Sequence, residues 1–374
     1  MSGSEAGDLG YMKNALALAS RGLGNTAPNP NVGCVIVKDS VIVGRGWTQP
    51  GGRPHAETEA LKRAGALATG ATAYVTLEPC CHHGQTGPCT EALISAGVSR
   101  AVIAAMDPDD RVNGAGVAAL KDAGIEVCTG LLEADAVASM SGYRKRTETG
   151  LPLIALKSAS SLDGRIALAS GASQWITGEG ARRYGHLLRA THDAVLVGSG
   201  TVQADNPSLT CRLSGYEDSC VSQPVRVVLD RRLRIERDAE LVGSAQSTPT
   251  CVVTGQSVDH DKVEQIEALG VEVLSSIESS DAAFALDAAK LLANKGLNRI
   301  LIEGGGKVAS SFLQAGLVDR IYALRAPMVV GGDGRSSIAD LSLGQLSDAP
   351  RFNRVETRVF GPDTLDILDR KLTV

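Results

Sequence analysis

The sequence predicts two α/β domains in one chain, and three observations lead to this fold class. The length of 374 residues exceeds that of one ordinary domain and allows two separate buried cores. In both halves, short apolar runs typical of buried strands alternate with stretches of helical periodicity. Nothing in the second half repeats the first at a fixed period, so we expect two different folds and not a duplication.

The first half is predicted to form a three-layer α/β sheet. Apolar residues at helical spacing over residues 11–21 indicate a helix that two glycines stop. NVGCVIV and VIVGRGW, separated by KDS, are typical of a hairpin. The pattern then alternates as helix 58–68, strand 73–77, helix 90–96, strand 100–106, helix GVAALKDAG and strand IEVCTG.

A domain boundary is predicted where RKRTETGLP, residues 144–152, interrupts the periodic pattern with charged and turn-forming residues. The expected domains are residues 1–148 and 149–374. The second α/β series comprises PLIALKSA, a helix over 180–189, DAVLVGSG, VRVVLD, TCVVTG, the helix DAAKLLANKG, NRILIEGGG, a helix over 308–315, and RIYALRA. Residues 214–223 indicate a surface loop.

Composition narrows the function classes. Hydrophobic residues make up 43% and charged residues 21% of the chain, which is ordinary for a globular protein. The net charge of −5 argues against nonspecific binding to nucleic acid or to an acidic membrane. Neither a membrane span nor a secretory signal is indicated. We expect a cytoplasmic protein whose eight cysteines are thiols or metal ligands and not disulfides.

The first half contains a candidate zinc site. His55, Cys80 and Cys89 are the three protein ligands that catalytic zinc typically takes, with a fourth position left for water. Such a zinc ion, one per chain, would lower the pKa of that water, and Glu57 has the chemistry to shuttle protons to the substrate. His55 and Glu57 can reach one centre only near a helix start. We expect Thr90 to cap the helix after Cys89, whose N-terminus favours a thiolate.

An isolated histidine and glutamate at this spacing would more often belong to an ordinary surface segment, with the cysteines in the core. The combination matches the H-x-E…P-C-x-x-C signature of zinc deaminases, which favours the metal site. One departure is that eight residues, and not two, separate Cys80 from Cys89. We expect this polar loop to lie beside the substrate.

TAPNPNVGCVIV, PHAETEAL and LEPCCHHGQTGPCTEALI together resemble the deaminase half of the bifunctional riboflavin-biosynthesis deaminase/reductase family. The resemblance implies deamination of a diamino-ribosylamino-pyrimidinone 5′-phosphate and then reduction of its ribosyl group to a ribityl chain. It also implies that Asn29 contacts the pyrimidine and that His82 or His83 lies near the substrate. The family often has a basic residue at the position of Gln85. Cys81 is expected to be a bystander.

Three stretches of the second half, in this order, resemble the reductase half of the same family. They are SASSLDGRIAL with SQWIT, VGSGTVQADNPSLTCR, and LIEGGGKVASSFL. The last turns through glycines into a helix start that suits a cofactor phosphate, although it lacks the G-x-G-x-x-G spacing. The resemblance implies a dihydrofolate-reductase-like fold and NADPH as cofactor.

Matching these stretches to the family by position assigns residues to an NADPH site and to a substrate site. The NADPH site would comprise Ala159, Trp175, Thr201, Asp205, Arg231, Gly305, Gly306, Lys307, Val308, Ala309, Ser310 and Ser311. The substrate site would comprise Ser173, Arg189, Leu209, Arg212 and Glu303. Arg189 and Arg212 suit a phosphate because guanidinium groups bind it bidentately. Trp175 either packs on a cofactor ring or fills the core.

The reduction also needs proton transfers, because the closed ribosylamine ring must open before a hydride is accepted. The candidates are Lys157, Asp205 and Glu303, and we rank Lys157 and Asp205 first as hypotheses.

Two other interpretations stay open at this point. A nucleoside, base or tRNA deaminase fused to an unrelated nicotinamide enzyme would share the zinc motif, although the acidic charge and the long spacer argue against it. A ligand-binding or regulatory protein without turnover is the second. The favoured interpretation is a cytoplasmic, homo-oligomeric enzyme that acts on a small pyrimidine ribosyl phosphate, without nucleic-acid or membrane partners.

Overall fold

The computed structural model describes residues 3–84, 87–215 and 222–371. Its internal contacts divide the chain into two compact units, Met1–Leu151 and Pro152–Val374, and each is described by itself. Gln85 and most of the loop predicted at 214–223 lie outside the described residues. Within the described residues, no helix is both long enough and apolar enough to cross a bilayer.

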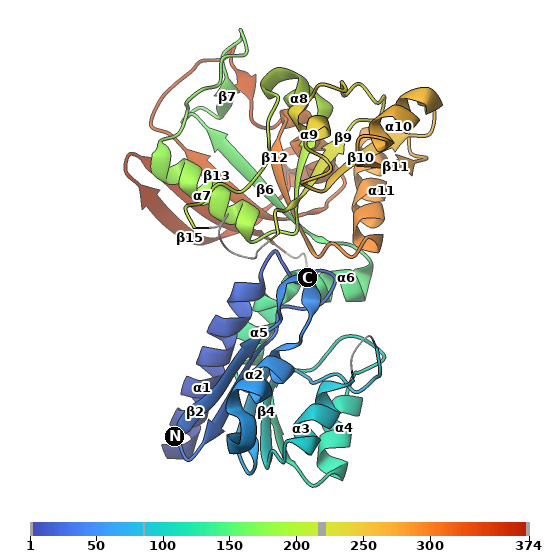
Figure 1. Ribbon diagram of the computed structural model, residues 1–374. Helices are drawn as coiled ribbons and strands as arrows, with labels where there is room; N and C mark the ends of the chain where they lie inside the picture. Colours follow the sequence, from blue (N-terminus) through green and yellow to red (C-terminus); the bar gives the residue numbers. More distant parts are fainter. Residues whose placement is uncertain (1–2, 85–86, 216–221, 372–374) are drawn as a thin grey trace. The chain divides into compact units, whose positions relative to one another are not determined.

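The first unit is built on a five-stranded sheet of order β2-β1-β3-β4-β5 (Figure 1). The predicted hairpin is present: β1 and β2 pair antiparallel and turn through Asp39 and Ser40, which both have positive φ. The next three strands pair parallel. The strands are β1 Gly33–Lys38, β2 Val41–Trp47, β3 Thr72–Leu77, β4 Arg100–Ala105 and β5 Glu126–Thr129.

Helices cover both faces of this sheet, as predicted for a three-layer fold (Figure 1). One face carries α1 (Gly3–Ala19), continued by η1 (Ser20–Gly22), and α5 (Glu133–Ser139); the other carries α2 (Ala56–Ala64), α3 (Cys89–Ser95) and α4 (Ala115–Asp122). Short 3-10 turns η2 (Pro50–Gly52) and η3 (Gly65–Ala68) flank α2.

Two strand glycines set how closely the long helices approach the sheet. A Cβ atom on Gly33 would lie 1.9 Å from the carbonyl oxygen of Ala15 in α1. A Cβ atom on Gly46 would lie 2.1 Å from the carbonyl oxygen of Ala56, the first residue of α2. Since the backbones occupy that space, only glycine fits at these two strand positions.

The charged stretch at 144–149 is helical and does not form the irregular connection that the sequence suggested. It lies in α6 (Ser141–Thr149), where Arg144 donates to Glu148 at 2.6 Å in an i,i+4 pair. The helix ends at Gly150, whose φ of 69° is the left-handed conformation common after a helix C-terminus. This segment carries an i,i+4 ion pair and lacks the apolar periodicity by which other helices were predicted.

The second unit contains a nine-stranded sheet of order β11-β10-β9-β8-β12-β6-β13-β16-β15. Neighbours from β11 to β13 pair parallel, and β16 and β15 add an antiparallel edge. The strands are β6 Leu153–Ser160, β8 Ala194–Gly198, β9 Val225–Leu229, β10 Thr250–Gly255, β11 Val271–Ser276, β12 Arg299–Gly304, β13 Val318–Arg325, β15 Phe352–Phe360 and β16 Asp363–Arg370. All strands predicted for this half are present.

Crossover helices connect the parallel strands, and the carboxyl ends of those strands meet at one edge of the sheet. The helices are α7 Glu179–Ala190, α8 Ser199–Asp205, α9 Glu240–Gly243, α10 His260–Glu267, α11 Asp281–Asn294 and α12 Gly306–Gln314. A small sheet of β7 (Arg165–Ala167) and β14 (Arg335–Ser336), and a 3-10 turn η4 (Leu346–Asp348), complete the unit. The core centres on β8 and β12, where Val195 and Leu301 are fully buried.

Candidate active sites

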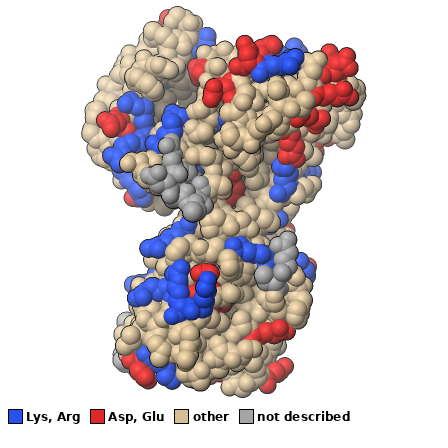
Figure 2. Space-filling model, in the orientation of Figure 1, with Lys and Arg blue, Asp and Glu red and all other residues tan. Residues whose placement is uncertain are grey.

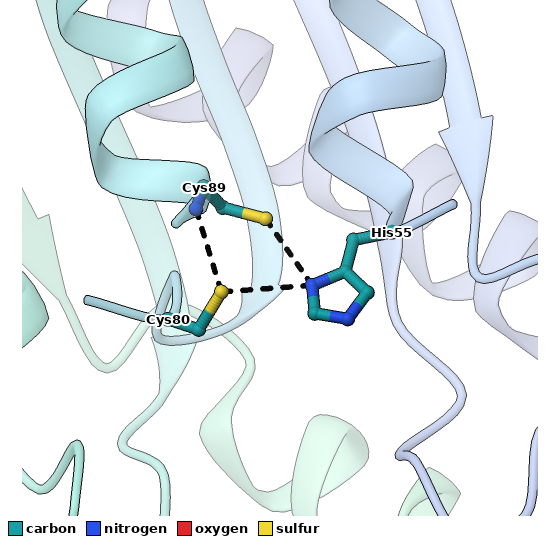
Figure 3. Close-up of side chains that lie close together, drawn as sticks. All are labelled: His55, Cys80 and Cys89. Carbon is teal, nitrogen blue, oxygen red and sulfur yellow. Dashed lines mark hydrogen bonds between the residues drawn. The ribbon is translucent and has the colours of Figure 1, made fainter. Parts of the chain in front are cut away.

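The three predicted zinc ligands come from separate elements of the first unit and converge on one point (Figure 3). His55 directly precedes α2, Cys80 lies in the segment after β3, and Cys89 opens α3. Their ligand atoms all lie within 4.8 Å of one another. His55 Nδ1 is 3.3 Å from Cys89 Sγ and 3.6 Å from Cys80 Sγ, so Nδ1 is the nitrogen that faces the sulfurs.

Backbone contacts join the two cysteine segments. Cys89 N–H donates to Cys80 Sγ at 3.4 Å, and Thr90 N–H donates to the Cys80 carbonyl at 3.2 Å. The predicted capping role of Thr90 is wrong, because α3 begins one residue earlier and Pro88 holds the N-cap position. Instead, the Thr90 hydroxyl donates to the same Cys80 carbonyl at 3.3 Å. This threonine therefore orients one metal ligand.

The electrostatics of the triad suit a metal. Hydrogen bonds from Cys89 and then from His55 lower the pKa of Cys80 to about 4, although burial opposes the shift. The pKa of Cys89 is raised well above its ordinary value, first by its bond to Cys80 and then by burial. Two sulfurs and one imidazole nitrogen are the borderline-soft donors that zinc takes, and three protein ligands leave a position open. The residues present therefore fit zinc.

Glu57 lies in the first turn of α2, and its residue is only 4% exposed. Burial raises the pKa of this carboxyl to about 7, while the charge of His55 opposes the shift. A cation held by the triad would likewise favour the carboxylate. A carboxyl group that gains and loses a proton near neutral pH is suited to general acid–base chemistry.

His55, Cys80 and Glu57 line a cavity of about 880 Å³ in the first unit. Asn29, His82 and His83, the predicted substrate residues of this half, also line it. Asn29 Nδ2 donates to the carbonyl of Gly52 at 2.9 Å, which fixes the segment that carries it. The structure thus brings these predicted residues together around one space.

Three further residues that were not predicted, Glu78, Asp107 and Tyr143, also line this cavity. Glu78 is 2% exposed, and its carboxylate accepts hydrogen bonds from the backbone amides of Gly114 and Val117 at 3.0 Å. Its place in the LEPC motif, two residues before Cys80, was a usable signal. Tyr143 donates to Asp107 at 3.0 Å, and both line the cavity. Tyr143 comes from α6, so sequence offered no signal for it.

In the second unit a buried carboxylate, that of Glu303, binds two predicted site residues. Arg189 donates to it through Nε at 2.6 Å and Nη2 at 3.0 Å. Lys157 Nζ lies 3.6 Å from its Oε2. Burial alone would raise the pKa of Glu303, but the charges of Arg189 and then Lys157 outweigh burial and lower it to about 2. Glu303 is therefore an ionised partner of both cations.

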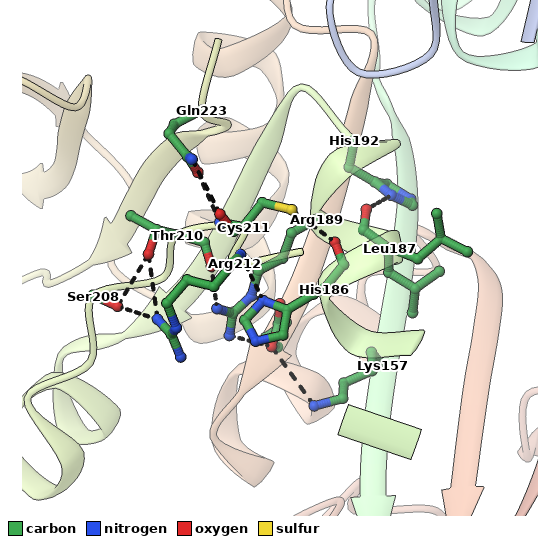
Figure 4. Close-up of polar contacts among 12 residues, drawn as sticks. Lys157, His186, Leu187, Arg189, His192, Ser208, Thr210, Cys211, Arg212 and Gln223 are labelled. Carbon is green, nitrogen blue, oxygen red and sulfur yellow. Dashed lines mark hydrogen bonds and ion pairs between the residues drawn. The ribbon is translucent and has the colours of Figure 1, made fainter. Parts of the chain in front are cut away.

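A second polar group surrounds Arg189 (Figure 4). Arg189 Nη1 donates to the carbonyl of Thr210 at 2.7 Å, and Arg212 Nη1 donates to the hydroxyl of Ser208 at 2.6 Å. His186 Nδ1 accepts from the backbone amide of Arg212 at 3.2 Å. His186, one helical turn before Arg189, was not among the predicted site residues. Leu209, between Ser208 and Thr210 in the chain, is buried and has a positive φ of 53°.

The segment predicted to bind the NADPH phosphates, 305–311, forms the entry and first turns of α12. Gly305 has a φ of 85°, a conformation that favours glycine. β12 and β8 are parallel neighbours, so the starts of α12 and α8 lie at the same sheet edge. A Cβ atom on Gly304 would lie 3.1 Å from Thr201 Oγ1 in α8. Thr201 therefore lies beside the turn that leads into α12.

The remaining predicted reductase residues are more scattered. The alternative that Trp175 fills the core is wrong, because its side chain is 68% exposed and its ring stacks on the Arg182 guanidinium at 4.6 Å. Arg231 donates to Asp281 at 2.7 Å at the start of α11. Asp205 ends α8 exposed. Ser173 is half-buried, as is Ala159 on β6.

Matches to known protein families divide the chain into the same two parts. Residues 6–105 match the cytidine and deoxycytidylate deaminase zinc-binding region, and residues 152–365 match the RibD C-terminal domain. The riboflavin biosynthesis protein RibD of Escherichia coli strain K12 is 44% identical over 94% of this chain and 96% of its own. The chain belongs to the RibD family.

Solved RibD structures agree over nearly the whole chain. RibD of Acinetobacter baumannii (form 2) superposes with a TM-score of 0.87 at 38% identity, over 98% of this chain and 100% of that one. A diaminohydroxyphosphoribosylaminopyrimidine deaminase/5-amino-6-(5-phosphoribosylamino)uracil reductase of Thermotoga maritima gives 0.84 at 33% identity, over 98% and 100%. The predicted family and fold class are confirmed.

As a RibD protein, the chain is a bifunctional deaminase and reductase of riboflavin biosynthesis. Its first unit is the zinc-binding deaminase domain, and its second is the NADPH-dependent reductase domain. The interpretations as an unrelated fusion and as a protein without turnover are set aside by the near-complete match.

Proposed function

We propose that the deaminase unit hydrolyses the ring amine of the diaminohydroxyphosphoribosylaminopyrimidine named for the Thermotoga maritima relative, and that the reductase unit reduces the deaminated product. The observation that carries this proposal is the convergence of the ligand atoms of His55, Cys80 and Cys89 within 4.8 Å. His55 and Cys80 line one cavity together with the buried Glu57. The proposed substrate is a small molecule.

In the deaminase unit, His55, Cys80 and Cys89 would hold the zinc ion. When bound there, zinc lowers the pKa of a water molecule so that it can attack a carbon. Glu57 takes a proton from that water and delivers it to the departing amine, which leaves as ammonia. Burial raises the pKa of the Glu57 carboxyl to about 7, so the group can do both near neutral pH. Asn29, His82 and His83 hold the pyrimidine in the cavity.

In the reductase unit, Arg189 and Arg212 bind the substrate phosphate, and Ser173, Leu209 and Glu303 complete the substrate site. NADPH supplies a hydride when bound along Thr201 and residues 305–311, with Ala159, Trp175, Asp205 and Arg231 as further contacts. Glu303 holds the ammonium of Lys157, a residue within β6, 3.6 Å away. From there, Lys157 gives a proton to the ring oxygen as the ribosylamine opens, and Asp205 is the second proton-transfer candidate.

One incubation tests both activities. Purified protein is mixed with the diamino-ribosylamino-pyrimidinone phosphate and NADPH, and ammonia and NADPH absorbance are followed together, with and without prior chelation. We expect ammonia release followed by NADPH oxidation, both lost after chelation because the second step needs the product of the first. Oxidation of NADPH without ammonia release would contradict the proposed order. The cytoplasmic location, the homo-oligomeric state and the absence of nucleic-acid partners stay predictions.

A further inference from the structure

The deaminase cavity holds arginines for which the proposed chemistry gives no task. Arg53, Arg111 and Arg146 line it together with two of the metal ligands, His55 and Cys80. Lys and Arg side chains also gather on one face of this unit (Figure 2). The proposed steps at the ring amine use a metal and a carboxyl group, and none of them uses a guanidinium. Positive side chains in the wall of a binding cavity indicate an anionic group on the ligand.

Arg111 is committed to a neighbouring carboxylate. Its Nε donates to Asp109 Oδ1 at 2.9 Å and its Nη2 donates to Oδ2 at 2.5 Å. This bidentate pair compensates the charge of Arg111 and holds the turn after β4, and the side chain is 70% exposed. Arg111 is therefore the weakest of the three candidates.

Arg53 and Arg146 are tied to one edge of the cavity by two consecutive residues. Asn29 Nδ2 donates to the carbonyl of Gly52, the residue before Arg53, at 2.9 Å. Arg146 Nη2 donates to the carbonyl of Pro28 at 2.7 Å. Since Pro28 and Asn29 are adjacent in the chain, they connect the two arginine-bearing segments, which are otherwise distant in sequence.

Arg53 also lies against the loop between the two cysteine ligands. A Cβ atom on Gly84 would be 3.6 Å from Arg53 Nη2, and Gly84 lines the same cavity. The next residue in the sequence, Gln85, is uncharged. Positive charge at this part of the loop is therefore brought by Arg53, from the segment before α2.

We propose that Arg53 and Arg146 bind the 5′-phosphate of the deaminase substrate at this edge of the cavity. The inference rests on the proposed function, since it takes the phosphorylated substrate as given. Two guanidinium groups match the charge of a phosphate dianion, and each can bind it through paired N–H donors. A phosphate fixed here would hold the pyrimidine in register with His55, Cys80 and Cys89.

The test compares two forms of the substrate. Arg53→Gln and Arg146→Gln, with Arg45→Gln as a control on the exposed face of β2, are assayed for ammonia release. The substrates are the phosphorylated compound and the same compound after phosphatase treatment. We expect each cavity variant to lose about 10- to 100-fold in kcat/KM on the phosphorylated substrate, mostly through KM. On the dephosphorylated one it should match the wild-type and control proteins.

Equal losses on both substrates, or no loss on the phosphorylated one, would overturn the proposal. Zinc content and NADPH oxidation with the deaminated product report whether each variant is folded. Arg53→Lys and Arg146→Lys should recover part of the lost affinity, because the charge is kept while the paired donors are not. A structural role alone would give no such dependence on the phosphate.

A separate binding measurement tests the phosphate site independently of the proposed function. If the wild-type protein releases no ammonia from either compound, that function is wrong, and ribose 5-phosphate becomes the probe. Weaker calorimetric binding by the Arg53→Gln/Arg146→Gln double variant than by Arg45→Gln would support the phosphate site. Equal binding of ribose 5-phosphate by the double variant and by Arg45→Gln would reject the phosphate site. Any binding by the second unit is the same in these two proteins and cancels in the comparison.

Discussion

His55 Nδ1 lies 3.3 Å from Cys89 Sγ, although 34 positions separate the two residues. The first belongs to the start of α2 and the second to the start of α3, so two helix N-termini meet at the metal site. The positive end of a helix favours a thiolate. Ligand geometry at this site thus depends on how both helices pack on the sheet.

Replacement of Cys89 by serine should weaken zinc binding. A hydroxyl group is a poor substitute for a thiolate ligand, and the exchange leaves two of three protein ligands in place. We expect substoichiometric zinc in the purified Cys89→Ser protein by elemental analysis, with ammonia release reduced in proportion. Cys81→Ser is the matched control, because Cys81 is adjacent to a ligand and outside the triad. Full zinc occupancy in Cys89→Ser would contradict its assignment.

Glu57→Gln should separate zinc binding from turnover. The amide keeps the size of the side chain and loses the ability to transfer protons, so ammonia release should fall at least about 100-fold. Zinc content should stay at one per chain, since Glu57 is outside the ligand set. Loss of zinc from this variant would show that Glu57 is itself a ligand.

Glu303→Gln should impair the reductase unit alone. Removal of this charge leaves Arg189 and Lys157 without their common buried partner, and breaking such a group costs about 3–5 kcal/mol. We expect a lower midpoint of denaturant unfolding for the second unit and loss of NADPH oxidation. Ammonia release should continue at the wild-type rate. An unchanged unfolding midpoint would mean that the ion pairs contribute little.

Asp205→Asn tests the ranking of the proton-transfer candidates. Asp205 is exposed at the end of α8, so the exchange should leave stability unchanged. If Asp205 transfers a proton, NADPH oxidation should fall about 100-fold or more. Unchanged oxidation would remove Asp205 from the mechanism and leave Lys157 as the remaining candidate.

His192 should make the second unit sensitive to mild acid. Burial, and then the charge of Arg299, lowers the pKa of this histidine from 6.5 to about 3. Between these values the unfolded chain binds the proton and the folded one does not, so stability is full above pH 6.5 and falls as the pH drops. From pH 7 to 5.5 the loss should be about 1.3 kcal/mol from this group.

Denaturant unfolding at several pH values measures that loss. In His192→Asn, which keeps a donor for the carbonyl of Leu188, the dependence of stability on pH should be flatter by this amount. His260→Asn, at an exposed position on α10, should retain the wild-type slope. Identical slopes in all three proteins would exclude His192 as the cause.

Local patterns were enough to predict much of this molecule. The alternating strands and helices, the hairpin and the metal ligands each depend on residues close in sequence or on a spaced motif. What could not be predicted depends on distant partners: Arg189 with Glu303, 114 positions apart, and Tyr143 with Asp107. The helix at 141–149 was missed because it carries an ion pair, Arg144 with Glu148, and lacks a clear apolar face. Thr90 was misassigned because the N-cap of α3 is Pro88, two residues earlier.

The contact between Gly46 and Ala56 has a consequence for how variants of this enzyme should be interpreted. Gly46 lies in a strand and is not a metal ligand. A side chain at this position would nevertheless collide with the backbone of Ala56, the residue that follows His55. A substitution at Gly46 would therefore present itself as a metal-affinity defect, with zinc lost before the unit unfolds. A screen for zinc-deficient clones would recover this strand glycine alongside the true ligands. Recovery of a residue in such a screen therefore does not show that the residue binds zinc.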